Sequence, residues 1–174
     1  TNRRQRQMCI RDRYNNIQMA KKISLNSAYG AIGNNWFRYY DLLVAEAITT
    51  SGQLSIRWIE SAVNKYLNGL LKTDNEDYVV ASDTDSIYVV FDKRVNKVFK
   101  EEQDVSRVIS FLDSVAREKI EPFINKSYED LHQYVNSYEQ KMQMSREVIA
   151  DKGIWTAKKR YILNVWDNEG VKYK

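Results

Sequence analysis

Apolar residues at helical spacing define two long stretches in the first part of the chain. From Tyr14 to about Ile32, apolar and small residues fall near one side of a helix, and Gly30 and Gly33 favour its end. A second helix is predicted from about Leu42 to Leu71. Its expected core positions recur three or four residues apart: Ile56, Ile59, Val63, Tyr66 or Leu67, and Leu70.

Two short apolar runs follow, and both are rich in β-branched and aromatic residues. Residues 78–81 (YVVA) and 87–91 (IYVVF) predict two strands, joined by a turn within residues 81–86 (ASDTDS). Aspartate and serine favour turns because their side chains bond the nearby backbone, so a plain polar turn is one interpretation. The other is a cation site. The carboxylates of Asp83 and Asp85, with one residue between them, repel each other unless a positive charge offsets them.

The remaining pattern predicts more helices and a final pair of strands. Val95 and Val98 indicate a short helix, and a clearer one contains Val105, Val108, Leu112 and Val115. Pro122, the only proline, suits the first turn of the next helix, where a missing N–H costs nothing. Apolar residues then alternate in two strands, expected to be joined around residues 151–153: Met142, Met144 and Val148 in one, and Tyr161, Leu163 and Val165 in the other.

The net charge of +4 suggests a nucleic-acid partner only until its location is considered. Residues 1–13 hold five arginines and one aspartate, which leaves 22 basic and 22 acidic residues in 14–174. The excess charge is therefore no evidence for DNA binding. Residues 1–13 also lack an apolar period, and we expect them to be a disordered or foreign leader, although a basic arm that binds phosphates is an alternative.

Several classes of protein do not fit this composition. The 174 residues, 43% of them hydrophobic, suffice for one domain with a sizeable core. No apolar run approaches the roughly 20 residues of a membrane span, and no secretory signal is visible. Cys9 has no partner for an internal disulfide, which fits a reducing compartment. His132 stands alone, so we expect a surface or packing role rather than a metal site.

Two motifs in a defined order resemble signatures of family B DNA polymerases. The signature K-x3-N-S-x-Y-G is matched by Lys22, Asn26, Ser27, Tyr29 and Gly30, and the hairpin signature D-T-D-S by residues 83–86. Residues 34–53 and 155–167 look most like the enzymes of T-even bacteriophages and their relatives. The resemblance covers residues 14–174, and four motifs in the right order make it specific.

The resemblance implies an α+β fold with parts of two domains. Residues 14–35 would be the C-terminal fingers helix. Residues 36–174 would form part of the palm domain, in which helices pack against an antiparallel sheet that carries the acidic hairpin. Another metal aspartate, the exonuclease domain and the thumb have no match here. We therefore expect a piece of a larger polymerase that is inactive alone.

The resemblance also implies template-directed DNA synthesis, in which a primer 3′-hydroxyl attacks the α-phosphate of a dNTP. Asp83, Asp85 and Glu147 would hold two Mg²⁺ ions, which Mn²⁺ can replace, with both aspartates counted as catalytic. Lys22 would bind the triphosphate and assist catalysis. The remaining expected contacts are Asn26, Tyr29 and Gly30 with the nucleotide, and Lys158, Lys159, Arg160 and Tyr161 with the primer–template duplex.

The expected partners are primer–template DNA and dNTP, with a sliding clamp as a further partner through segments outside this chain. The expected location is the cytoplasm of a phage-infected bacterium, with no membrane contact. Two alternatives stay open. One is a non-catalytic DNA-binding module that uses residues 159–161. The other is a glycosyltransferase whose D-x-D turn holds a metal, although that fold usually begins with alternating strands and helices.

Overall fold

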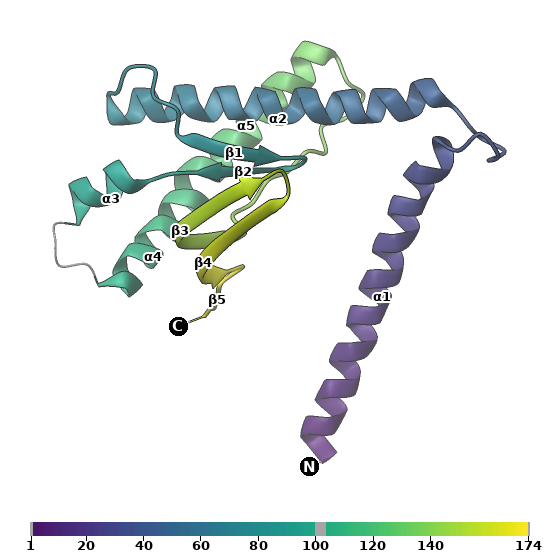
Figure 1. Cartoon of the computed structure of the whole chain (residues 1–174), viewed down its shortest axis with the longest axis horizontal. Coiled ribbons are helices and arrows are strands. Elements are labelled where there is room, and N and C mark those ends of the chain that lie inside the picture. The colour runs from purple at the N-terminus through teal and green to yellow at the C-terminus, as the bar shows by residue number, and fades with distance from the viewer. Residues whose placement is uncertain (1, 100–103, 174) are drawn as a thin grey trace. The chain divides into compact units, whose positions relative to one another are not determined.

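The computed structural model describes residues 2–99 and 104–173, and the chain divides into two compact units, 1–51 and 52–174. Figure 1 names the helices and strands. The boundary between the units falls inside the second helix.

Unit 1–51 consists of helix α1 (Asn2–Ile32), a connecting turn, and the start of helix α2 (Leu42–Leu71). The predicted helix therefore ends where expected but begins at Asn2 rather than Tyr14, so the expectation of disorder in residues 2–13 is wrong. Arginine, glutamine and methionine have high helix propensity, which does not require an apolar period. Helix α2 has the predicted bounds, and Asp41 caps it by accepting a hydrogen bond from the N–H of Val44 at 3.1 Å.

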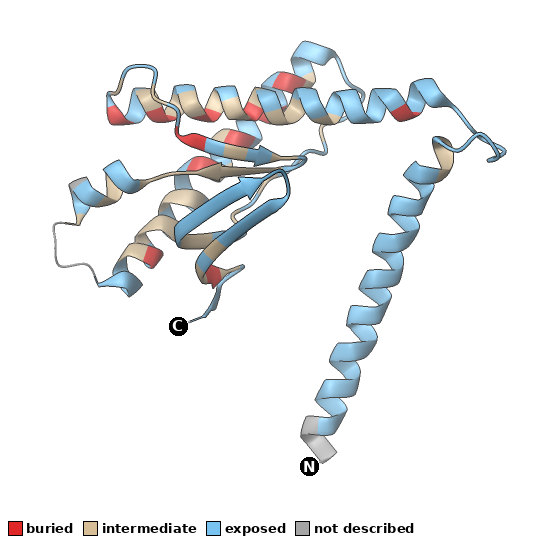
Figure 2. Ribbon diagram, in the orientation of Figure 1, coloured by how far each residue is buried: buried red, intermediate tan, exposed pale blue. Residues whose placement is uncertain are grey.

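The core of unit 52–174 forms where one face of α2 meets the helices that follow the first hairpin. Ile59, Val63 and Leu67 are fully buried, and Leu71 is nearly so. The expected core position Leu70 is wrong, since 42% of it is exposed. The burial continues at four-residue steps, because side chains four apart share a helix face. The other members of this cluster are Tyr78, Val79, Ile120, Ile124, Tyr128 and Leu131, and Figure 2 shows the buried positions in red.

Helices follow the first hairpin much as the pattern predicted. Helix α3 spans Asp92–Val98 and α4 spans Val105–Val115. A π-helical turn, η1 (Ala116–Ile120), joins α4 to α5 (Glu121–Val135). Pro122 lies in the first turn of α5, as expected.

The strands form two antiparallel sheets. Strands β1 (Val79–Asp83) and β2 (Ser86–Val89) make a hairpin, and β3 (Val148–Ala157), β4 (Arg160–Asn168) and β5 (Val171–Lys172) make a sheet in that order. The turn expected around residues 151–153 is wrong, because β3 continues through them and the chain reverses at residues 158–159. Met142 and Met144 also lie outside the strands of the described chain.

The observed architecture confirms the α+β fold class. Helices and strands come in separate runs along the chain, and no strands pair in parallel among the described residues. No helix in residues 2–99 or 104–173 is long and apolar enough to cross a membrane.

Candidate functional site

The acidic turn is the two-residue connection of the β1–β2 hairpin. Asp83 pairs with Ser86, and Thr84 between them has a left-handed φ of 52°. The N–H of Asp85 donates to the carbonyl oxygen of Asp83 at 2.6 Å, and the Ser86 hydroxyl donates to the same oxygen at 3.2 Å. The Thr84 hydroxyl donates to Asp83 Oδ1 at 3.0 Å. The turn therefore holds both predicted metal carboxylates on a tightly hydrogen-bonded backbone.

The two carboxylates have different surroundings. The Asp83 side chain is about one-third exposed, and Lys159 Nζ lies 3.8 Å from its Oδ1. Asp85 is exposed. Burial raises the pKa of the Tyr128 phenol on α5, and the negative charge of Asp85 raises it further.

The predicted DNA-binding residues form the tip of the β3–β4 hairpin. Lys158 and Lys159 make the turn, with Lys159 at a left-handed φ of 62°, and Arg160 and Tyr161 begin β4. All four residues are exposed. Because Lys159 reaches Asp83, the predicted DNA-binding and metal-binding residues are neighbours.

Two aromatic residues that the sequence did not single out complete this neighbourhood. The Tyr88 ring on β2 contacts the Trp155 ring with centroids 5.3 Å apart and the Tyr161 ring at 5.5 Å. Burial, the hydrogen bond with Tyr161 and the negative charge of Asp83 raise the pKa of Tyr88 to about 12. The position of Tyr88 in the sequence could have predicted this. Tyr88 lies two residues after Ser86, and side chains two residues apart share a strand face.

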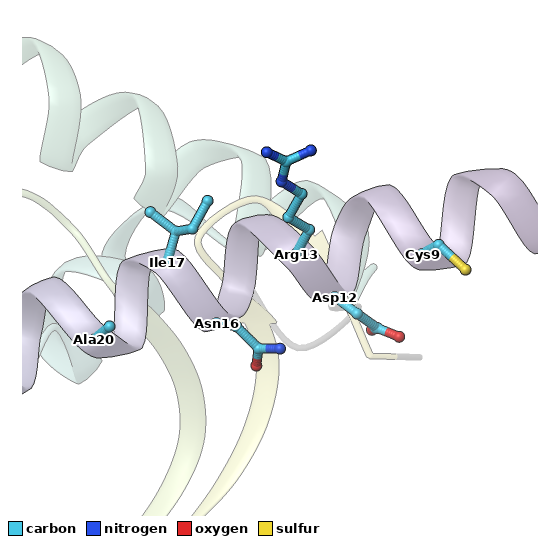
Figure 3. A pocket seen from close by; sticks show the side chains of 6 residues that line it. All are labelled: Cys9, Asp12, Arg13, Asn16, Ile17 and Ala20. Atoms are coloured by element: carbon cyan, nitrogen blue, oxygen red, sulfur yellow. The ribbon is translucent and has the colours of Figure 1, made fainter.

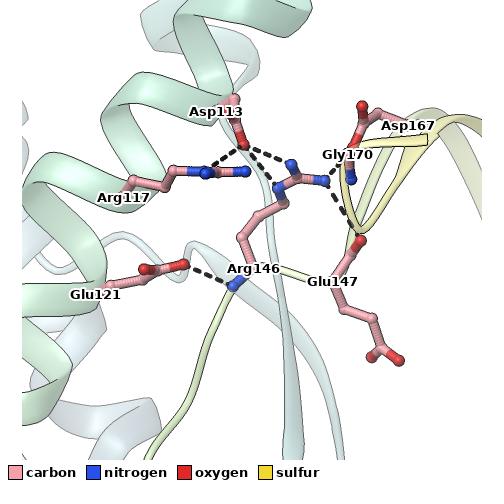
Figure 4. A network of polar contacts seen from close by, with 7 residues as sticks. All are labelled: Asp113, Arg117, Glu121, Arg146, Glu147, Asp167 and Gly170. Carbon is pink, nitrogen blue, oxygen red and sulfur yellow. Dashed lines mark hydrogen bonds and ion pairs between the residues drawn. The ribbon is translucent and has the colours of Figure 1, made fainter. Parts of the chain in front are cut away.

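Glu147, the third predicted metal ligand, lies just before β3 and is exposed. Its carbonyl oxygen accepts hydrogen bonds from the N–H of Glu169 at 2.7 Å and from Arg146 at 3.4 Å. Its carboxylate points away from these contacts (Figure 4). Among the described residues, no three histidine, cysteine, aspartate or glutamate side chains gather in a group able to hold a metal. The role of Glu147 stays a prediction.

A buried ion-pair network at the base of the β3–β4 hairpin was not predicted (Figure 4). The Arg146 guanidinium contacts Asp113 on α4, with Nη2 2.5 Å from Oδ1, and also pairs with Asp167 on β4. The N–H of Arg146 donates to Glu121 at 2.8 Å, and the N–H of Gly170 donates to Asp167 at 3.0 Å.

The network changes the proton affinity of its buried members. Burial alone would raise the pKa of Asp167, but the hydrogen bonds from Arg146 and Gly170 outweigh it, so the pKa is lowered. Burial would likewise lower the pKa of Arg146, and its hydrogen bonds to Asp167 and Asp113 raise it instead. A single buried aspartate and a single arginine far apart in sequence carry no pattern that predicts such a pair.

The predicted nucleotide-binding residues lie on α1 in unit 1–51. Lys22, Asn26 and Tyr29 share one helix face at spacings of four and seven residues, and all three are exposed. A Cβ built on Gly30 would meet no described atom within 4 Å, so the backbone there is open to close approach. These positions fit the expected contacts, and the contacts themselves stay predictions.

A shallow hollow on α1 carries no comparable chemistry. Its six lining residues all come from this one helix: Cys9, Asp12, Arg13, Asn16, Ile17 and Ala20 (Figure 3). It is therefore a gap between side chains of a single helix rather than an enclosed cavity.

Comparison with known proteins adds independent findings. The profile of DNA polymerase family B matches residues 3–121. The chain is 48% identical over 165 residues to the DNA-directed DNA polymerase of Escherichia phage RB69, and 44% identical over 171 residues to that of Enterobacteria phage T4. A DNA polymerase of Choristoneura biennis entomopoxvirus is 26% identical over 142 residues, 66% of this chain and 15% of that protein.

The two phage alignments cover 90% and 91% of this chain but only 18% and 19% of the phage proteins. The chain therefore spans about a fifth of the length of these curated relatives. The family match also begins at residue 3, within the segment 1–13 that lacked a recognisable motif.

Proposed function

The chain belongs to DNA polymerase family B, and from that premise we propose that it supplies part of the site where a polymerase joins a dNTP to a primer 3′-hydroxyl. The observation that carries the proposal is the contact between the two hairpins. Lys159, from the predicted DNA-binding run, lies 3.8 Å from Asp83 of the predicted metal pair. One small region thus presents carboxylates for cations and basic residues for phosphates.

The carboxylates of Asp83 and Asp85 suit divalent cations of the Mg²⁺ class. Mg²⁺ prefers hard oxygen ligands and binds through one or two carboxylates, retained waters and substrate phosphates. The Lys159 ammonium lies 3.8 Å from Asp83 and would compete with a cation for this carboxylate. We propose Asp83 and Asp85 as ligands of two Mg²⁺ or Mn²⁺ ions. Glu147 lies at the other end of the β3–β4 hairpin from Lys159, so its role stays a separate prediction. Bound ions of this kind neutralise phosphate charge and activate the attacking hydroxyl.

The remaining residues position the substrates. Lys159 and Arg160 would bind the duplex phosphates, a grip that is independent of base sequence. Tyr161 and Lys158 would extend the same surface. On α1, Lys22 would bind the dNTP triphosphate as a point charge and assist departure of pyrophosphate, beside Asn26, Tyr29 and Gly30.

We assign residues 14–35 to the end of the fingers and residues 36–174 to the palm. Residues 1–13 are proposed as a leader outside both, and the family match from residue 3 is the observation against that assignment. The proposed setting is the cytoplasm of a phage-infected bacterium. Any sliding clamp would bind elsewhere on the whole protein. The family match and the long opening helices oppose the glycosyltransferase alternative.

Binding of Mn²⁺, followed by electron paramagnetic resonance, tests the cation site. We expect Asp83→Asn and Asp85→Asn each to weaken Mn²⁺ binding at least tenfold, because each removes a charged oxygen ligand. Asp74→Asn, at an exposed position before β1, is the control. Equal Mn²⁺ affinity in the wild type and in both hairpin variants would contradict the cation site.

Fluorescence anisotropy with labelled primer–template DNA tests the duplex contacts. Affinity should fall steeply with salt, and Lys159→Met should weaken binding and reduce that salt dependence. If DNA binds in this way while the chain takes up no Mn²⁺, the non-catalytic binding module is the better function.

We also propose that the chain does not extend a primer by itself, because four-fifths of each phage relative lies outside the aligned region. Primer extension by the purified chain with dNTP and Mg²⁺ is the assay. Extension that Asp85→Asn abolishes would refute this part of the proposal.

A further inference from the structure

The absence of a side chain at Gly153 is what allows the Trp155 ring to fold back along β3. A Cβ at residue 153 would lie 2.6 Å from Cη2 and 2.7 Å from Cζ3 of Trp155. It would also lie 2.8 Å from Cδ2 of Leu163 on β4. These separations are well inside van der Waals contact. Any larger residue at position 153 therefore forces the indole ring to move.

The strand register places these groups on one face of the sheet. Gly153 pairs with Leu163, and Trp155 pairs with Tyr161, so all four side-chain positions lie on the same side. The intervening residues Ile154 and Ile162 point to the other side and are 63% and 72% exposed. The face that carries Gly153 is thus the one that contacts another element.

That other element is the acidic hairpin, through Tyr88. The Tyr88 ring meets Trp155 edge to face, at 5.3 Å and 74°, and Tyr161 at 5.5 Å and 62°. Edge-to-face geometry at this separation is favourable for aromatic pairs. Tyr88 therefore contacts two rings from two different strands of the neighbouring sheet.

The tip of the β3–β4 hairpin needs such an anchor. The Arg146 network holds the base of this hairpin, where Asp167 pairs with Ile149. Lys159 lies about ten residues further along, roughly 30 Å at strand spacing. An isolated two-stranded hairpin is only marginally stable in water, so contacts at its distal end are needed to hold it.

We propose that the Gly153 gap, with the Trp155–Tyr88–Tyr161 ring contact it permits, docks the β3–β4 hairpin on the acidic hairpin and holds Lys159 at Asp83. Gly153 and Tyr88 are positioning residues, since they act through Lys159 and not on any substrate. The docking is a property of the chain itself. Its consequence for cation and DNA binding rests on the proposed function.

A carbodiimide cross-link tests the docking without metal or DNA. The reagent joins a carboxylate directly to an amine as an amide, so it reports whether Asp83 and Lys159 are in contact. Mass spectrometry of the peptide pair should detect the link in the wild type. Gly153→Ala should reduce the linked fraction at least fivefold, because the displaced Trp155 ring no longer holds Tyr88.

Gly69→Ala is the matched control. Gly69 lies in helix α2 with no described atom within 4 Å of a built Cβ, so its replacement should leave the cross-link unchanged. Tyr88→Leu removes the ring from the opposite side without creating a clash in β3, and it should also abolish the link. An undiminished cross-link in folded Gly153→Ala or in Tyr88→Leu overturns the proposal.

A double variant separates docking from general stability. Gly153→Ala with Trp155→Leu removes the indole ring and with it the two shortest of the three close contacts, those to Cη2 and Cζ3 of Trp155. We expect its thermal midpoint to recover relative to Gly153→Ala while the cross-link stays absent. Recovery of both would show that Gly153 matters only for stability, and would overturn the positioning role.

Mn²⁺ binding then connects docking to the proposed site. Lys159→Met alone should raise the Mn²⁺ affinity, because the ammonium competes for Asp83. Added to Gly153→Ala, the same substitution should leave the Mn²⁺ affinity unchanged, because Lys159 no longer lies at Asp83. Absence of Mn²⁺ binding with an intact cross-link pattern would refute the proposed cation site and leave the docking established. If Mn²⁺ binds as proposed but the cross-link no longer depends on Gly153 and Tyr88, only the docking is refuted.

Discussion

At the residue scale, Arg146 is the centre of a nearly buried ion-pair network in unit 52–174. Its side chain is 9% exposed, that of its partner Asp167 is 6% exposed, and a second partner, Asp113, comes from α4. Buried charges are tolerated only when paired and hydrogen-bonded, and removal of one partner leaves the other uncompensated. Arg146 therefore joins helix α4 to the base of the C-terminal sheet. The stability of this junction depends on the guanidinium, which compensates the buried charge of Asp167.

We predict that Arg146→Met lowers the free energy of unfolding by about 3–5 kcal/mol, because Asp167 then stays buried without a counter-charge. The lowered pKa of Asp167 adds a pH signature. Its ionised form stabilises the wild type above the ordinary aspartate pKa of about 3.9, and this contribution disappears as the pH falls through the lowered value. Urea unfolding at neutral pH and below pH 4 measures both effects.

Arg117→Met is the control for this prediction. Arg117 contacts the same Asp113 at 3.1 Å, but its side chain is 59% exposed, so the expected loss is below about 1 kcal/mol. The pH dependence should also differ: the free energy of unfolding of Arg146→Met should fall less on acidification than that of the wild type, because Arg146 is what lowers the pKa of Asp167. Equal losses in the two variants would show that the buried network is not a stabilising feature.

At the element scale, helix α2 organises the core of unit 52–174. Its buried residues advance by four, from Ile59 to Val63, Leu67 and Leu71. Each step of four residues turns the buried position by about 40° around the helix, so the buried face rotates towards Leu71 and away from Leu70. The same face packs against Tyr78, Val79 and the buried residues of α5.

We predict that Leu67→Ala destabilises the protein by about 2–5 kcal/mol, because it opens a cavity at a fully buried position. Leu70→Ala, at a site that is 42% exposed in the same helix, should change stability by only about 0.5 kcal/mol. Chemical denaturation followed by circular dichroism compares the two. A larger loss at residue 70 would restore the original core assignment.

At the scale of the whole molecule, the two units differ in how much they bury. All ten residues of the main core cluster lie in 52–174. Among the described residues of unit 1–51 whose burial is defined, only Ala45 is buried. Helices gain most of their stability from tertiary packing, so the two units should differ in cooperativity.

We predict that residues 52–174 expressed alone unfold in one cooperative thermal transition, whereas residues 1–51 alone lose helicity gradually. Circular dichroism at 222 nm during heating tests both pieces. The full chain provides the reference for the midpoint. A sharp transition in 1–51 would mean that this unit has a core of its own that burial does not reveal.

The sequence by itself determined the features that depend on neighbours within a few turns of chain. Helix α2, the β1–β2 hairpin and the position of Pro122 follow from apolar period, turn residues and proline geometry, all local effects. The motif match was likewise readable along the chain. The alternation of apolar and polar residues could not locate the turn between β3 and β4. The same pattern is compatible with a reversal at Gly153 or with one several residues later, where it occurs.

Tertiary structure alone decided which distant side chains meet. Lys159 at Asp83, Tyr88 between Trp155 and Tyr161, and Arg146 with Asp167 all join segments that no periodicity relates. Such contacts depend on the packing of whole elements against a shared core, where burial and charge pairing are satisfied together. The individual carboxylates and lysines were visible in the sequence, and their adjacency was a consequence of the fold.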